Sequence, residues 1–131
     1  MIIHKPTDIE EQIRTALNTY LTAYVPPLPA SYTLPNIMIR ANGGSTANTI
    51  DTFMVTLSSR AETDAEALEY LNDALGILAE QAAAQVNGIR NVTINSLASW
   101  GTDPARPDLK LCTATVLVTA HRESKQITTN T

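Results

Sequence analysis

A chain of 131 residues, of which 44% are apolar and 17% charged, has the composition of one globular domain. A domain of this size buries roughly two-thirds of the surface that its unfolded chain exposes, so its core needs no disulfide or metal. The net charge is −4, and nine basic residues are scattered between Lys5 and Lys125. This charge pattern argues against a protein that binds the nucleic-acid backbone directly.

The sequence also argues against a membrane protein and a disulfide-bonded protein. No stretch approaches the roughly 20 apolar residues that span a bilayer, and the first residues lack the apolar core of a secretion signal. We therefore expect a soluble chain that is not exported and has no membrane partner. The single cysteine, Cys112, has no partner within the chain, which excludes an intramolecular disulfide.

The first predicted element is an amphipathic helix over residues 7–24. Thr7 precedes Glu10 by three residues, which is the spacing of a capping box, where each side chain binds the other's backbone amide. Apolar side chains then recur on one face: Ile9, Ile13, Leu17, Tyr20, Leu21 and Tyr24. Prolines cannot continue the helix, so residues 25–35 are expected to form an extended linker.

A β-hairpin follows, with strands on either side of the segment GGSTAN, residues 43–48. Because glycine tolerates positive φ angles, this segment predicts a reversal with a longish, flexible tip. In the second strand Phe53, Val55 and Leu57 alternate with polar neighbours. Strand geometry predicts that these three side chains face the core, whereas Met54 and the polar residues face outward.

The next predicted element is a long helix that begins at a second capping box, formed by Thr63 and Glu66. Asn87 and Gly88 indicate a left-handed cap at its end. Helical spacing places Tyr70 and Ile77 on the side opposite to the apolar face, which consists of Leu68, Leu71, Leu75, Leu78 and Ala82. Tyr70 and Ile77 therefore need another partner, either the first helix or a second copy of the chain.

The last third predicts two more strands, joined by a stiff connection that contains two prolines. The predicted fold class is α+β, with an antiparallel four-stranded sheet packed by helices in the order α-β-β-α-β-β. Residues 1–131 are expected to form a single domain. It comprises the helix 7–24, the linker 25–35, an α+β core over 36–123 and a flexible tail over 124–131.

The sequence predicts no catalytic, cofactor-binding or metal-binding residues, and we do not expect an enzyme. His4 and His121 lie near opposite ends of the chain, without the clustered ligands that a metal requires. The segment NGGS lacks the lysine and the helix start of a phosphate-binding loop. Trp100 is either an interface anchor or a core residue. Free sheet edges and a two-faced helix instead suit a protein that closes into a ring.

The pattern resembles that of the small tail terminator or tail completion proteins of long-tailed bacteriophages. The resemblance covers residues 7–123 and consists of three features: an amphipathic first helix that ends in a proline-rich turn, the strand-to-helix unit IDTFMVTLSSRAETDAEALEYLNDALGIL, and the hairpin VTINSLASWGTDPARPDLKLCTATVLVTAHRE. It implies a virion structural protein that forms a hexameric ring at the head-proximal end of the tail. Such a ring caps the tail tube, ends tail polymerisation and provides the head-tail joining surface.

The resemblance also implies partners and a location. The partners are the chain itself, the tail tube protein and a head-completion or neck protein, and DNA only passes through the pore. Assembly takes place in the host cytoplasm. Neck or head-tail connector adaptors are the main alternative, followed by a small-molecule-binding module or an uncharacterised enzyme.

The predicted interface comprises two loops, 42–48 and 101–108, and two helical side chains. Its residues are Asn42, Gly43, Gly44, Ser45, Thr46, Tyr70, Ile77, Trp100, Asp103 and Arg106. Two alternatives stand beside this interpretation. The loops are simple turns, or the two helical side chains pack under the first helix within one subunit.

Overall fold

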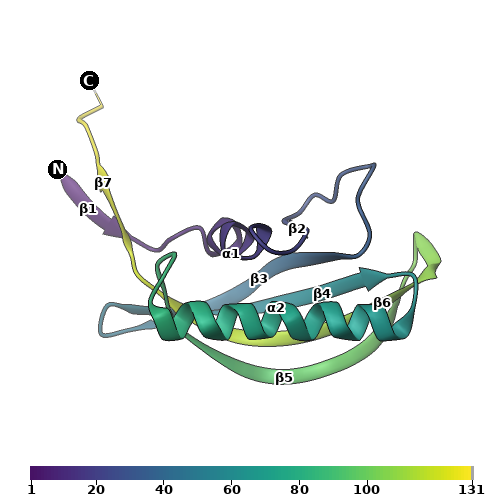
Figure 1. Cartoon of the computed structure of the whole chain (residues 1–131). Helices are drawn as coiled ribbons and strands as arrows, with labels where there is room; N and C mark the ends of the chain where they lie inside the picture. Colours follow the sequence, from purple (N-terminus) through teal and green to yellow (C-terminus); the bar gives the residue numbers. More distant parts are fainter. Residues whose placement is uncertain (131) are drawn as a thin grey trace.

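The computed structural model describes residues 1–130. The fold is α+β, as predicted, with about half of the described residues in strands (Figure 1). In chain order the elements are β1 (Ile2–Lys5), α1 (Ile9–Asn18), β2 (Ala23–Tyr24), β3 (Asn36–Ala47), β4 (Ile50–Ala61), α2 (Asp64–Ala84), β5 (Ile89–Asp103), β6 (Arg106–Ala120) and β7 (Glu123–Gln126).

The main sheet has five strands in the order β2-β3-β4-β6-β5, so the predicted four-stranded sheet is wrong. β2 is the additional strand, and it runs parallel to β3, whereas the other pairs are antiparallel. It was missed because Tyr24, one of its two residues, completes the helical apolar pattern of the first predicted helix. β1 and β7 pair with each other in a separate two-stranded sheet.

The core lies between the main sheet and the two helices. On β4 the predicted alternation is confirmed: Val55 and Leu57 are fully buried, and Phe53 packs against the core. α2 covers them with Leu71, Leu75 and Leu78. The opposite face of the sheet carries cross-strand hydroxyl pairs at Thr52–Thr119 and Ser58–Thr113, 3.3 and 3.2 Å apart, together with the apolar pair Met54–Leu117.

The first helix is shorter than predicted, because α1 spans Ile9–Asn18 and not 7–24. Its N-cap is Asp8, whose Oδ1 accepts a hydrogen bond from the Glu11 amide at 3.3 Å, so the capping box at Thr7 is wrong. A carboxylate one residue further along takes that role. The chain leaves the helix early because Ala23 and Tyr24 join the sheet as β2, and just before them the Thr22 carbonyl accepts from the Ile37 amide at 2.9 Å.

The second helix begins as predicted, with the Thr63 hydroxyl accepting from the Glu66 amide at 3.2 Å. It ends earlier, at a left-handed residue Gln85 with φ of 56°, so Asn87 and Gly88 are not its cap. They also have positive φ and turn the chain toward β5. Four of the five predicted core positions of this helix are buried, but Leu68 is exposed.

The segment 42–48 is strand for most of its length, which corrects the prediction of a flexible loop. The two glycines absorb a bulge between Ala41 and Gly44, and β3 then continues to Ala47. Gly44 approaches β4 so closely that a Cβ there would lie 2.2 Å from the Thr52 carbonyl oxygen. The reversal itself is made by Asn48 and Thr49, both with positive φ, as two-residue hairpins require.

The second hairpin and the C-terminal tail are also more regular than predicted. Asp103 pairs with Arg106 across a two-residue turn, so the expected loop 101–108 is mainly strand. The first three residues of the predicted flexible tail, 124–126, belong to the strand β7 (Glu123–Gln126), which is held by backbone pairing with Ile2–Lys5. Thr131, the last residue of that predicted tail, lies outside the described residues.

Candidate interaction surfaces

The two hairpin tips lie at opposite ends of the main sheet. The β3–β4 turn follows the end where Asp51 pairs with Ala120, and the β5–β6 turn follows the end where Ala61 pairs with Lys110. At about 3.3 Å per residue, a 12-residue strand such as β4 separates these ends by roughly 35 Å. The predicted interface residues 42–46 and 103–106 are therefore not brought together.

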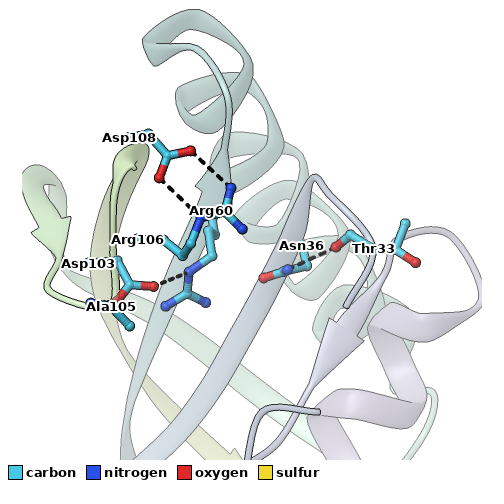
Figure 2. Close-up of polar contacts among 7 residues, drawn as sticks. All are labelled: Thr33, Asn36, Arg60, Asp103, Ala105, Arg106 and Asp108. Carbon is cyan, nitrogen blue, oxygen red and sulfur yellow. Dashed lines mark hydrogen bonds and ion pairs between the residues drawn. The ribbon is translucent and has the colours of Figure 1, made fainter. Parts of the chain in front are cut away.

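The β5–β6 tip is fixed to the rest of the sheet by a largely buried ion pair (Figure 2). Arg60 Nε lies 3.0 Å from Asp103 Oδ2, and both side chains are only 12% exposed. Asp103 Oδ1 also accepts from the Ala105 amide at 3.0 Å, and the Tyr32 ring stacks 5.7 Å from the Arg60 guanidinium. Within one subunit, the predicted interface residue Asp103 therefore has a structural role.

Arg106 is on the surface of the same tip and faces Asp108 (Figure 2). Its Nε and Nη2 atoms lie 3.1 and 2.9 Å from the two carboxylate oxygens of Asp108. These hydrogen bonds hold the pKa of the Asp108 carboxyl below its ordinary value. The pair is half exposed, so it remains open to an external partner and adds little to stability by itself.

The opposite end of the sheet is held by Asp51, a buried carboxylate. Arg122 donates to it through Nε at 2.8 Å and Nη2 at 2.9 Å, and Thr46 Oγ1 donates at 2.6 Å. The hydrogen bonds from Arg122, followed by the one from Thr46, lower the pKa of Asp51. Asn42 is also engaged within the subunit, because its amide donates to Thr56. The remaining predicted residues of this hairpin, Gly43, Gly44 and Ser45, are exposed on β3.

The largest open edge of the sheet belongs to β5, which pairs only with β6 within residues 1–130. We call its outer side, with the exposed apolar residues Ile94, Leu97 and Trp100, the β5 edge. Leu97 is 71% exposed and Trp100 is 52% exposed. Trp100 is thus not a core residue of the single subunit. Leu97 was missed because bulges between Ile94 and Ser99 break the period-two pattern that would identify its face.

A second apolar surface lies between the end of α1 and the outer side of α2. This helix hollow, of about 800 Å³, is lined mainly by Tyr20, Leu21, Ile77 and Val86, with Asp73 and Glu80 among its polar residues. Ile77, a predicted interface residue, is half-buried here. Tyr70 lies nearer the start of α2 than Ile77. It is engaged within the same chain, because its hydroxyl accepts from the Thr22 amide at 2.6 Å.

The described residues offer little for metal binding or thiol chemistry. Within residues 1–130 no group of three or more His, Cys, Asp or Glu side chains is placed to hold a metal ion. Cys112 is buried beneath the helices, and this burial raises the pKa of its thiol. None of the helices in the same range is long and apolar enough to span a bilayer.

Comparison with known proteins adds no assignment to these surfaces. A scan against models of protein families finds none that matches this chain, and a search of curated proteins finds no significant match.

Proposed function

We propose that this chain is a virion structural protein of a long-tailed bacteriophage. It forms a ring on the end of the tail tube, ends tail polymerisation and provides the surface to which the head joins. The observation that carries the proposal is the β5 edge, because a 15-residue strand leaves one side unpaired and exposes three apolar side chains. Such an edge is a template for pairing with another chain, and apolar exposure of this kind marks an interaction site.

The opposite edge of the sheet supports closure into a ring. β2 covers β3 only at Ile37 and Met38, and the Glu10 carboxylate accepts from the Ala41 amide at 2.8 Å. The rest of β3 up to Ala47 has no further strand beside it within the described chain. Contact between the β5 edge of one copy and the β3 edge of the next joins two different surfaces. Repeated head to tail, such a contact generates a closed ring, for which the resemblance to tail terminators gives six copies.

The hairpin tips supply two further faces. Because they lie at opposite ends of the sheet, one tip faces the tail tube protein and the other faces a head-completion or neck protein. The net charge of −4 suits a pore that lets DNA slide without binding it. The ring is located in the virion, at the head-proximal end of the tail, after assembly in the host cytoplasm. A neck adaptor between portal and tail is the second candidate, because it uses the same ring.

The proposal is tested by adding the protein to polymerising tail tube protein and measuring tube lengths by negative-stain imaging. We expect shorter tubes with a ring at one end, and rings in light scattering at high protein concentration. Leu97→Glu should abolish both effects, because it places a charge in the β5 edge. Met54→Glu is the matched control, since Met54 is an exposed apolar residue in the middle of the same sheet.

Two outcomes would contradict this function. Tubes that grow to the same length with and without the protein would exclude a terminator, and rings that bind portal protein instead would favour the neck adaptor. A monomer at every concentration, with no binding to tubes or portal, would exclude both candidates.

A further inference from the structure

The two ends of the chain form an arm that stands away from the body (Figure 1). The terminal arm consists of β1 and β7, which pair from Ile2↔Gln126 to Lys5↔Glu123, together with the flanking residues Met1 and Ile127. Two four-residue strands without a third are marginally stable in water. The arm nevertheless carries apolar side chains at its tip, with Met1 80% and Ile2 66% exposed. Its composition therefore fits a segment that packs against another surface.

The charge of the arm is basic. Lys5 and Glu123 form an ion pair at 3.5 Å, whereas Lys125 has no ion-pair partner within residues 1–130. His4 is engaged within the arm, where its Nδ1 atom lies 3.1 Å from the Ser124 hydroxyl oxygen. A partner surface for this arm should thus combine an apolar floor with carboxylates at its rim.

The helix hollow has both properties. Leu21, Ile77 and Val86 provide apolar lining, while Asp73 and Glu80 provide the carboxylates. α2 carries five carboxylates along its length and neither Lys nor Arg, so no basic side chain of that helix competes for them. None of the residues that line the hollow comes from the terminal arm of the same subunit.

The direction of the arm is set by its base. Arg122 immediately precedes β7 and is bound to Asp51 through two hydrogen bonds. This ion pair links the arm to the β3–β4 end of the sheet. With its base tied to the sheet, the arm extends away from its own body (Figure 1).

We propose that the terminal arm of one subunit docks in the helix hollow of a second copy of this chain. Met1 and Ile127, which lie on the same face of the arm as Lys125, then cover Ile77 and Val86, and Lys125 faces Asp73 and Glu80. This contact rests on the proposed ring and deepens it, since it is a second link between neighbours, separate from the β5 edge. It also gives the exposed apolar residues of both surfaces a shared function.

Disulfide trapping between two different variants, each with one introduced cysteine, tests this contact. A subunit with Ile127→Cys is mixed with a subunit with Val86→Cys that carries a size tag, under mild oxidation. The native Cys112 is buried and does not compete. We expect at least a tenfold excess of the mixed, tagged dimer over the yield with a control, Ala65→Cys at an exposed α2 position outside the hollow, in place of Val86→Cys.

Charge exchange provides an independent measurement. Lys125→Glu should reduce the fraction of cross-linked dimer severalfold, and Glu80→Lys in the partner should restore it. Control substitutions of the same type, Lys110→Glu and Glu62→Lys, change exposed charges outside both surfaces and should have no effect.

The outcomes separate this proposal from the ring itself. Rings without the mixed cross-link would overturn arm docking and leave the proposed function in place. A chain that carries both cysteines and closes a disulfide within the monomer would also overturn it, because the arm would then occupy its own hollow. A chain that neither self-associates nor binds tail tubes would overturn the ring and, with it, the docking of the arm.

Discussion

Two long strands of the same sheet, β4 and β5, use their apolar residues in opposite ways. β4 lies between β3 and β6, and its apolar side chains Val55 and Leu57 are fully buried against α2. β5 is longer, yet Leu97 and Trp100 point into solvent. The folding of one chain accounts for Val55 and Leu57 on β4 but not for Leu97 and Trp100 on β5. Under the proposed function, these exposed residues of β5 contact a neighbouring copy of the chain.

The largest difference in stability should be the one between a leucine on β4 and a leucine on β5. Leu57→Ala removes a fully buried side chain and leaves a cavity, so we expect a loss of about 2–5 kcal/mol in the free energy of unfolding. Leu97→Ala should change the unfolding free energy of the separated subunit by less than about 0.5 kcal/mol. Urea unfolding at low protein concentration measures both values.

In an assembly assay, the order of the two effects should be reversed, with Leu97→Ala as the more damaging substitution. Leu97→Ala should lower the fraction of rings in light scattering, although it leaves the subunit folded. The comparison between the strands would fail if Leu97→Ala destabilised the separated subunit as much as Leu57→Ala does, because Leu97 would then belong to the core.

The ion pairs of the β5–β6 tip allow a comparison of polar residues. Arg60→Ala leaves the Asp103 carboxylate largely buried without its cation, so we expect a loss of about 3 kcal/mol. Arg106→Ala breaks an exposed pair and should cost less than about 1 kcal/mol. Thermal unfolding of the two variants provides the measurement. Equal losses would mean that Asp103 finds another partner when Arg60 is absent.

The helix caps should show a smaller effect. Thr63→Ala removes the acceptor for the Glu66 amide and should destabilise the fold by about 1 kcal/mol. Asp8→Ala should have a similar effect at the start of α1, whereas Thr7→Ala should have almost none. Circular dichroism during urea unfolding gives all three values. A loss on Thr7→Ala that equals the loss on Asp8→Ala would restore the capping box expected from sequence.

Sequence patterns predicted those parts of the fold in which the spacing of apolar residues fits only one kind of secondary structure. Val55 and Leu57 alternate with polar neighbours along an unbroken strand, and Thr63 stands directly before a helical repeat, so strand, helix and N-cap were all predictable. The short strand β2 was not, because its residue Tyr24 also continues a helical apolar pattern. Tertiary pairing with β3 decides between the two structures.

The candidate surfaces were less predictable, for a physical reason. The bulges of β5 shift the face to which Leu97 belongs, and only the register with β6 reveals that shift. The arm depends on backbone pairing between residues about as far apart as the chain allows, Ile2 and Gln126, and side-chain periodicity carries no signal for it. Trp100 was identified by its residue type alone, whereas Asp103 proved to be engaged with Arg60 inside the subunit.

The smallest expected effect concerns pH and the Asp51–Arg122 pair, which ties the arm to the sheet. The folded pKa of Asp51 lies below its ordinary value, chiefly because Arg122 donates hydrogen bonds to the carboxylate. The stability from this pair is therefore complete above the unfolded pKa of about 4 and is lost as the pH falls toward the lower folded value. Asp51→Asn should flatten the decrease in unfolding free energy below pH 4, measured by urea titrations at several pH values. Asp73→Asn, which changes an exposed carboxylate of the helix hollow, is the matched control and should leave the wild-type pH profile of the separated subunit unchanged. An Asp51→Asn profile as steep as that of the wild type would show that other carboxylates determine the acid sensitivity, and that Arg122 does not anchor the arm through this charge.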